Sequence, residues 1–429
     1  MAVHVIHEAH RCLQCKEPLC MLHGCPLKTD IPGMIREFLA GNANKAGAML
    51  FENNPMSDVC SMVCDHEKQC EGHCLLSKEP GGSAVQISAI EHYISDLYLR
   101  KFSLARRARR GQRVAVIGAG PAGLTVATKL AQHGYDVTIF ERMDKIGGLM
   151  RYGIPDFRLP RRILDTYAHK LKRLGVHIRP HTTLGGALRL DDLFADGYDA
   201  VFIGAGVWRA RRLGVKGETL GNCHYAIDYL QDPYVYELGP RVAIIGSGND
   251  AMDAARTAIR HGSEQVYVVA RHYEVSSSKR QAEYAQADGA EIIYARHTVE
   301  ITPEGPLLAL RHFDENGKCT REDEAKLLQV NSTIISVSQV PKDKIARTTH
   351  GLETNERGLI EVDENGQTTR EGVFSGGDVV TGASRVVLAV RNAKKVAAAM
   401  ERYLEEKAAS DAGTQRAPEA PHPILHGFE

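Results

Sequence analysis

The chain has 429 residues, which is too long for one ordinary hydrophobic core, so we expect two or three domains. Its 53 basic and 53 acidic residues give a formal net charge of zero, which argues against nucleic acid as the main partner. The first residues, MAVHVIHEAHRC, contain no apolar core of signal-peptide length, and no apolar run is long enough to span a bilayer. We therefore expect a soluble, cytoplasmic protein without a membrane partner.

The N-terminal region, residues 1–105, is predicted to be a helical domain organised around cysteines. Eight of the 10 cysteines lie within the first 74 residues, and helical patterns cover residues 31–40 and 85–99. In a reducing cytoplasm such a cluster indicates metal ligation rather than disulfides. The spacing within the two groups is Cys12-x2-Cys15-x4-Cys20-x4-Cys25-Pro26 and Cys60-x3-Cys64-x5-Cys70-x3-Cys74.

Four thiolates in each group suit two [4Fe–4S] clusters, and a cysteine run that ends in Cys-Pro is typical of bacterial ferredoxins. In such runs the last cysteine commonly binds the other cluster, so we expect the two groups to interleave. Structural zinc, which also binds four cysteines, is the alternative. Zinc sites usually show paired C-x2-C spacings, and the sequence contains one such pair, Cys12 and Cys15. Iron–sulfur ligation is the favoured interpretation.

A first dinucleotide-binding unit follows an Arg-rich connector. Residues 114–117 form an apolar strand pattern, GAGPAG at residues 118–123 opens a helix that reaches about residue 133, and a second strand covers residues 137–140. In this motif the first glycine permits the tight turn, the second lets the backbone approach a pyrophosphate, and the third lets helix and strand pack closely. The phosphates lie at the helix N-terminus. Glu141, which ends the second strand, is placed to bind the hydroxyls of an adenosine ribose.

Two further stretches favour FAD over NAD at this unit. GGLM at residues 147–150 follows Glu141 closely, and GVFSGGD at residues 372–378 ends a strand before a helix predicted over residues 384–404. Asp378 can bind the ribitol, and the N-terminus of the following helix can stabilise negative charge on reduced flavin. We therefore predict an FAD-binding domain made of residues 112–240 and 336–407, followed by a disordered tail at residues 408–429.

A second dinucleotide-binding unit repeats this order of strand, glycine-rich turn, helix and strand over residues 241–335. A strand at residues 242–245 leads into GSGNDA, a helix to about residue 261 and a strand at residues 266–270. Arg271 and His272 then stand where an acid would favour the free 2′-hydroxyl of NAD. A basic residue suits the 2′-phosphate of NADP, so the sequence predicts NADP here, with NAD as the alternative.

The two remaining cysteines, Cys223 and Cys319, argue against a thiol relay. Disulfide reductases of this architecture need a dithiol pair near the flavin, and no C-x-x-C spacing occurs beyond Cys74. We expect both residues to be buried small hydrophobic side chains. A flavin beside the cysteine-rich domain needs a one-electron acceptor instead, and zinc cannot be one. This requirement favours iron–sulfur clusters further.

Taken in order, these parts resemble the small subunit of bacterial glutamate synthase. They are similar too to the N-terminal half of dihydropyrimidine dehydrogenase and to the larger subunit of electron-bifurcating NADH-dependent ferredoxin:NADP oxidoreductase. The resemblance covers residues 11–404 through CxxCxxxxC…CP, CxxxCxxxxxCxxxC, GAGPAG, GGLMRYGIPDFRLP, GSGNDAMD and GVFSGGDVV. The expected fold is an α/β flavoprotein with doubly wound, Rossmann-like FAD and NAD(P) domains and an N-terminal α-helical iron–sulfur domain.

The resemblance also implies which residues bind each group. One cluster would use Cys12, Cys15, Cys20 and Cys74, and the other Cys25, Cys64, Cys70 and Glu91, with Cys60 left spare. FAD would lie on Ala119, Gly120, Pro121, Ala122, Gly123, Glu141, Gly148, Leu149, Arg158, Gly377 and Asp378. NADP would lie on Ser247, Gly248, Asn249, Asp250, Arg271 and His272.

The chain departs from the family pattern at three places. Four residues separate Cys20 from Cys25, where the family usually has three, so that loop must bulge. His272 stands where the family usually has a second basic residue, which weakens the NADP assignment. Ser338 stands where the family tends to have glycine.

The function implied is hydride transfer from NAD(P)H to FAD, followed by single-electron steps into the clusters. No acid–base residue is strictly required, because the protein's part is largely to stack the rings and exclude solvent, so the sequence identifies no catalytic side chain. The chain has no glutaminase-like or barrel segment, so we expect a partner catalytic subunit, or a ferredoxin-like acceptor, to dock at the cysteine-rich end. Two alternatives stay open: a subunit of an electron-bifurcating transhydrogenase, and a zinc-stabilised nucleotide-binding interaction protein.

Overall fold

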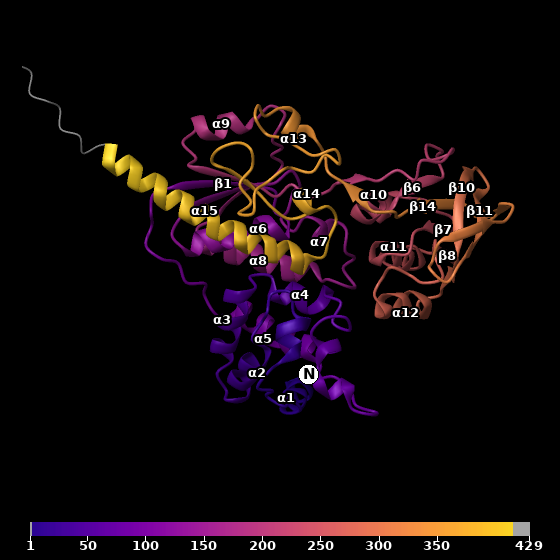
Figure 1. Ribbon diagram of the computed structural model, residues 1–429, viewed down its shortest axis with the longest axis horizontal. Helices are drawn as coiled ribbons and strands as arrows, with labels where there is room; N and C mark the ends of the chain where they lie inside the picture. Colours follow the sequence, from indigo (N-terminus) through magenta and orange to yellow (C-terminus); the bar gives the residue numbers. More distant parts are fainter. Residues whose placement is uncertain (1, 415–429) are drawn as a thin grey trace, which may run out of the picture.

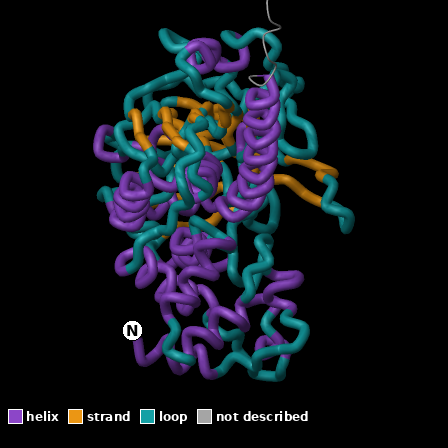
Figure 2. Tube along the Cα trace, turned by 90° about the vertical axis from the view of Figure 1, so that its left-hand side faces the viewer, coloured by secondary structure: helices purple, strands orange, loops and turns teal. Residues whose placement is uncertain are grey.

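Three structural parts make up residues 2–414, which are the residues described by the computed structural model (Figure 1). The N-terminal helices lie below a central α/β domain, and a second α/β domain lies at the side of the central one. The view turned by 90° shows the strands gathered above a region of helices and loops (Figure 2). Helical and α/β parts are therefore segregated along the chain.

The N-terminal domain is a bundle in which α5 packs against α3 and α4. Its second helix starts at an N-cap, Asp30, whose carboxylate accepts a hydrogen bond from the N–H of Gly33 (2.9 Å), with Pro32 in the first turn. The helices are α1 (Ala2–His10), α2 (Ile31–Leu39), α3 (Ala43–Asn53), α4 (Ser57–Val63) and α5 (Ile87–Lys101). Three short turns, η1 (Cys20–Gly24), η2 (Glu71–His73) and η3 (Leu75–Lys78), carry or border the cysteines.

The central domain contains a parallel sheet with the order β16-β4-β1-β2-β3. The apolar run predicted at residues 114–117 forms the middle strand, which is buried on both faces as parallel strands usually are. The strands are β1 (Arg113–Ile117), β2 (Asp136–Phe140), β3 (His177–Arg179), β4 (Ala200–Ile203) and β16 (Val373–Ser375). The helices are α6 (Pro121–Gln132), α7 (Leu149–Tyr152), α8 (Arg161–Leu174), α9 (Leu190–Ala195), α13 (Lys344–Arg347), α14 (Asp378–Thr381) and α15 (Val386–Thr414).

The last helix, α15, extends further than the sequence predicts. It packs along α6 and runs on to Thr414, so residues 408–414 are helical where a disordered tail was expected (Figure 1). This segment is rich in alanine, which has the best intrinsic helix propensity, and it prolongs a helix that is already packed on the domain. The rest of that predicted tail lies outside the described residues.

The second α/β domain contains a parallel sheet with the order β6-β14-β7-β8-β9. Its elements are β6 (Cys223–Tyr225), α10 (Ala226–Gln231), η4 (Pro233–Val235), β7 (Arg241–Ile245), α11 (Asn249–Arg260), β8 (Gln265–Val269), α12 (Lys279–Ala287), β9 (Ala290–Ile293) and β14 (Ser332–Ile335). An antiparallel set joins β11 (Gly305–Phe313) to β10 (Arg296–Thr302), β12 (Cys319–Glu322) and β13 (Lys326–Leu327).

The domain boundary differs from the one expected at residue 241. Strand β6 pairs with β14, so residues 223–231 belong to the second α/β domain. A strand of three residues carries no pattern that tells which sheet it will join. The predicted burial of Cys223 and Cys319 is also wrong: both are half-buried, because β6 and β12 are edge strands.

The two α/β domains are connected by two chain crossings that pair with each other. Strand β5 (Arg209–Ala210) leaves the central domain and β15 (Gln339–Val340) returns to it, and the two form an antiparallel ribbon. A different boundary, between the N-terminal helices and the central domain, contains continuous core. Phe51, Met56 and Leu99 pack in the same cluster as Val116 and Leu124.

Candidate functional site

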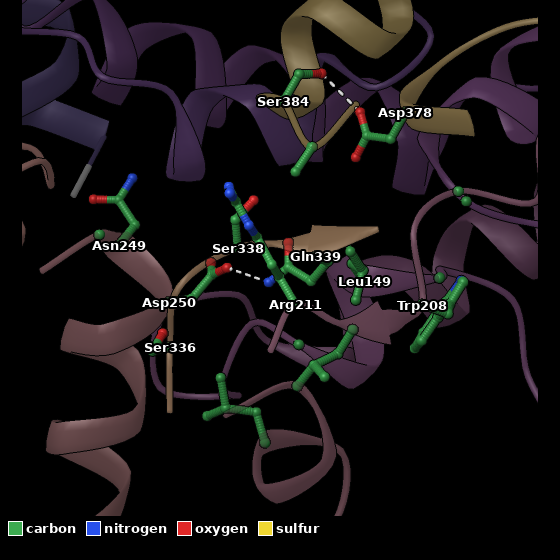
Figure 3. Close-up of a pocket in the computed structure, with 18 of the residues that line it drawn as sticks. Leu149, Trp208, Arg211, Asn249, Asp250, Ser336, Ser338, Gln339, Asp378 and Ser384 are labelled. Atoms are coloured by element: carbon green, nitrogen blue, oxygen red, sulfur yellow. Dashed lines mark hydrogen bonds between the residues drawn. The ribbon is translucent and has the colours of Figure 1, made fainter. Parts of the chain in front are cut away.

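A cavity of about 920 Å³ lies between the two α/β domains, where both dinucleotide motifs open into it (Figure 3). The carboxyl ends of β1 and β7 meet there, as expected for ligand sites of parallel α/β sheets. The sequence-predicted residues that line it are Ala119, Gly120, Pro121, Ala122, Glu141, Gly148, Leu149, Asp378, Ser247, Gly248, Asn249, Asp250, Arg271 and His272.

The first motif has the geometry of a phosphate cradle. Gly118 takes a φ of +94°, which favours glycine, and α6 begins three residues later at Pro121. A side chain at Gly120 would meet no protein atom within 4 Å, so the backbone there faces open space. At Gly123 an added Cβ would lie 2.0 Å from the Gly118 carbonyl oxygen. Gly123 therefore serves packing and does not line the cavity.

Glu141 is held in place by backbone amides. Its Oε2 accepts from the N–H of Ala119 (2.6 Å) and its Oε1 from the N–H of Met143 (2.9 Å). Burial raises the pKa of this carboxyl, and the amide hydrogen bonds counter part of that effect. Each carboxylate oxygen keeps a further lone pair for a ribose hydroxyl.

Across the cavity, Asp378 stands at the start of α14. Its Oδ1 accepts from Ser384 Oγ (2.7 Å), and Figure 3 shows this pair facing Asp250 and Gln339. Burial raises the pKa of Asp378 to about 6. Gly377, the residue before it, has a φ of +75° and does not line the cavity. Gly377 therefore positions the backbone of Asp378 and does not itself contact a ligand.

The second motif is covered by a serine-rich loop. The N–H of Ser277 donates to the Ser247 carbonyl oxygen (2.9 Å), and the N–H of Ser278 donates to Asn249 Oδ1 (3.0 Å). Asp250 Oδ2 accepts from Gln339 Nε2 (2.8 Å) in the returning crossing. The motif is thus tied both to its own domain and to the connection between domains.

Several cavity residues were not found from the sequence. Arg296 follows β9 as Arg271 follows β8, and its N–H donates to the Ala270 carbonyl oxygen (3.0 Å). Strands β8 and β9 are parallel neighbours, so their ends share one sheet edge, but the sequence alone does not show which strands become neighbours. Trp208, with the Arg142 guanidinium carbon 4.2 Å from its ring centroid, had no comparable signal.

Ser338 occupies a backbone conformation that favours glycine. Its φ is +84°, in agreement with the expectation of glycine at this position in the family. It lines the cavity between the two domains, and its carbonyl oxygen accepts from the N–H of Arg211 (3.1 Å). The serine is therefore held by the pairing of the two crossings.

Arg158 is not brought to the cavity. Its guanidinium forms an ion pair with Asp253 of α11 at 2.5 Å, which joins the central domain to the second α/β domain. The resemblance places this residue on FAD, and that role remains a prediction.

The first cysteine set converges as the resemblance implies. Cys12, Cys15, Cys20 and Cys74 line one small cavity of about 30 Å³, together with apolar residues such as Ile31. Burial, together with the neighbouring Cys74 and Cys12, raises the pKa of Cys20 to about 12. Free thiols would gain little stability from this arrangement, whereas four sulfur donors around one cavity suit an iron–sulfur cluster.

The second set is gathered around Cys64, which is half-buried, and Cys70, which is buried. Hydrogen bonding to Cys60 and burial raise the pKa of Cys64, and burial and Glu91 raise that of Cys70, which also faces Cys25. Burial raises the pKa of Glu91 to about 8. A buried carboxylate beside thiols fits a ligand to a cationic centre.

The described residues contain neither a preformed metal-ion site nor a membrane-spanning helix. No group of three or more His, Cys, Asp or Glu side chains among residues 2–414 is arranged to hold a metal ion, and the first cysteine set surrounds a cavity instead. None of the described helices is both long and apolar enough to cross a bilayer.

Comparison with protein families identifies both halves of the chain. Residues 112–397 match the pyridine nucleotide-disulphide oxidoreductase model, and a second match of this model covers residues 86–193. Residues 2–102 match the model described as dihydropyrimidine dehydrogenase domain II, 4Fe-4S cluster. The matches over residues 2–102 and 112–397 follow the division between the helical and α/β parts, and the match over residues 86–193 crosses it.

Individual proteins give the same picture. The chain is 31% identical to the glutamate synthase [NADPH] small chain of Halomonas elongata, over 93% of this chain and 90% of that one. It is 33% identical to the NAD-dependent dihydropyrimidine dehydrogenase subunit PreT homolog of Salmonella typhi, over 94% of each chain. The structure of Mycobacterium tuberculosis FprA in complex with NADPH shares the fold, with a TM-score of 0.59 and 17% identity over 73% of this chain and 88% of that chain.

These findings confirm the resemblance and the fold class expected from the sequence. The chain belongs to the pyridine nucleotide-disulphide oxidoreductase family, and it is an NAD(P)H-dependent, FAD-containing oxidoreductase with an N-terminal domain of the 4Fe-4S type.

Proposed function

We propose that this chain is an electron-input subunit that takes electrons from NADPH and passes them through two [4Fe–4S] clusters to a partner catalytic subunit of the glutamate synthase or dihydropyrimidine dehydrogenase type. The observation that carries the proposal is the order of the sites: both dinucleotide motifs open into one cavity, and the cysteine-rich domain shares a core with the central domain. When bound, FAD accepts a hydride and the clusters accept electrons singly. The chain binds and orients these groups and excludes water.

The second cysteine set reaches the core of the central domain, whereas the first does not. Cys64 packs against the core that contains Val116 of the central sheet, and Cys25 contacts both that core and the core of the N-terminal helices. Cys70 belongs to the N-terminal core, and Cys12 and Cys20 pack on that core alone. This order supports the set around Cys64 as the entry point for electrons and the set around Cys12 as their exit.

An ion pair links the lining of the cavity to the second cysteine set. Arg385 lines the cavity, and its guanidinium lies 3.7 Å from a carboxylate oxygen of Asp65, the residue after Cys64. This ion pair supports an arrangement in which the second cysteine set lies next to the flavin site.

The exit end is apolar at the surface. Leu13 and Leu75, which line the cavity of the first cysteine set, are 59% and 39% exposed, and Leu22 nearby in sequence is 42% exposed. Exposed apolar side chains around a redox centre suit a protein partner, because docking there covers them and brings the acceptor close. We place the partner's docking site at this end.

The choice of NADPH rests on the charge at one end of the cavity. Arg271 and Arg296 supply two guanidinium groups at the ends of adjacent strands, with His272 and His297 beside them. Glu274 also lines the cavity and offsets one of these two positive charges. Two guanidinium groups suit a dianionic 2′-phosphate. The relatives named above include one labelled NADPH and one labelled NAD-dependent, so their names do not decide between the two cofactors. The positive charge of Arg271 and Arg296 is therefore the argument for NADPH.

Anaerobic purification tests the proposal directly. We expect about eight iron atoms and about eight acid-labile sulfides for each FAD, four of each per cluster. NADPH should bleach the flavin absorbance and then that of the clusters. A native partner should co-purify, and Leu22→Glu, at an exposed leucine outside the cavity of the first cysteine set, should reduce its recovery without changing the iron content. Protein that lacks iron and sulfide, or that NADPH does not reduce, would refute the electron-input role.

A further inference from the structure

A buried ion pair joins the two dinucleotide-binding domains away from their connecting ribbon. Arg158, in the loop before α8, and Asp253, on α11, meet at 2.5 Å, and their side chains are only 9% and 1% exposed. Within residues 2–414, Arg158 Nε and Asp253 Oδ1 have no hydrogen-bond partner. A charge pair removed this far from water is stable only while both partners are present, because either charge alone would be buried uncompensated.

The same face of α11 also contacts Phe157, the residue before Arg158. The guanidinium carbons of Arg256 and Arg260 lie 4.6 Å and 4.2 Å from the ring centroid of Phe157. Both arginines are fixed by Asp288, at 2.7 Å and 2.5 Å. Residues 253, 256 and 260 follow helical spacing along one face, so α11 presents a continuous stripe to the loop of the central domain.

Both ends of this contact lie close to ligand-binding backbone. Helix α11 begins at Asn249, where the second dinucleotide motif lines the cavity, and Asp253 is one turn further along. On the other side, Ile154 lines the cavity four residues before Arg158, and the N–H of Arg158 donates to the Pro155 carbonyl oxygen (3.0 Å). A rigid path of a few residues therefore connects the ion pair to each dinucleotide site.

We infer that the Arg158–Asp253 pair is a positioning clasp that holds the NAD(P) domain against the FAD domain at the separation that hydride transfer needs. The inference rests on the proposed function in that both dinucleotides share the cavity. Reacting atoms must approach to about 3–3.5 Å, and a misplacement of about 1 Å costs on the order of 100-fold in rate. The chain crosses between the domains only through β5 and β15 in the described residues, so their relative placement depends on contacts such as this pair.

Three variants of the holoprotein test the clasp. Asp253→Asn keeps the shape of the side chain and removes its charge, and Arg158→Met with Asp253→Leu replaces the pair by apolar groups that can repack. Asp165→Asn is the matched control, because it breaks an ion pair with the largely buried Arg151 inside the central domain. The measurements are FAD content, the Kd for NADP⁺, urea unfolding, and the anaerobic rate of flavin bleaching by NADPH with its deuterium isotope effect.

If the pair is a clasp, its variants should change the rate of flavin bleaching without changing cofactor binding. In Asp253→Asn, flavin bleaching should slow by about 10- to 100-fold, with FAD content unchanged and the Kd for NADP⁺ within about threefold of wild type. The double variant should regain the wild-type urea midpoint and still bleach slowly. Asp165→Asn should bleach at the wild-type rate.

Other outcomes would overturn the inference. If the double variant recovers the rate together with the stability, the pair is only structural. If the double variant loses FAD while Asp253→Asn keeps it, Arg158 is a flavin ligand rather than a clasp residue. If wild-type protein carries FAD and is bleached by neither NADPH nor NADH, the proposed function itself fails, which is distinguishable from failure of the clasp alone.

Discussion

Gly120→Ala and Gly123→Ala make the same chemical change at two points of one turn, and the structure predicts different consequences. At Gly120 the added Cβ meets nothing within 4 Å, and the backbone φ of −77° is open to alanine. At Gly123 it would lie 2.0 Å from the Gly118 carbonyl oxygen and 3.2 Å from Val116 Cγ1. The protein without flavin should therefore tolerate the first change and resist the second.

The magnitudes follow from these contacts. A Cβ at Gly123 would penetrate about 1.3 Å inside a close C···O separation of about 3.3 Å, so α6 must shift away from β1. Overpacking of this kind costs about 1–3 kcal/mol of the free energy of unfolding, and we expect the upper end because both clashing groups are fixed. Gly120→Ala should change that free energy by less than about 0.5 kcal/mol. It fills the space where backbone approaches a pyrophosphate, so the affinity for FAD should fall about 100-fold, or about 2.7 kcal/mol.

Two assays separate these effects. Urea unfolding of flavin-stripped protein, followed by circular dichroism, measures stability, and quenching of flavin fluorescence during titration measures the Kd for FAD. A wild-type Kd in Gly120→Ala would refute the phosphate cradle. A wild-type urea midpoint in Gly123→Ala would refute the packing role.

Three further predictions concern the other sites. Arg271→Ala and Arg296→Ala should each raise the KM for NADPH at least about tenfold, the worth of one charged contact to the 2′-phosphate, and leave that for NADH nearly unchanged; equal effects on both cofactors in steady-state assays would contradict the phosphate site. Glu91→Ala should remove about half of the iron and sulfide, whereas Cys60→Ser should retain both clusters; the reverse pattern in metal analysis would make Cys60 the ligand. Because burial raises the pKa of Asp378 from 3.8 to about 6, the folded state holds a proton that the unfolded chain has lost in this range, so its contribution to stability falls as the pH rises from about 4 to about 6. Asp378→Asn should therefore flatten the dependence of the urea midpoint on pH over that window, and an unchanged slope would show that this carboxyl titrates normally.

Local chemistry determined much of this protein directly from the sequence. Strand, glycine turn, helix and second strand follow one another within about thirty residues, so the backbone of both dinucleotide motifs could be predicted without knowing their surroundings. The separate role of Gly123 in packing was predicted on the same ground, and the Cβ geometry agrees with it. The left-handed φ of Ser338 likewise agrees with a position that favours glycine.

Only the tertiary structure decided how distant segments meet. The sequence does not show that Arg296 shares a sheet edge with Arg271, because that depends on which strands become neighbours. It does not show that Arg158 pairs with Asp253 rather than reaching the cavity, because residues 95 positions apart are joined by domain packing. Sequence patterns record each segment's own conformation, whereas contacts between domains arise from burial that many segments determine together.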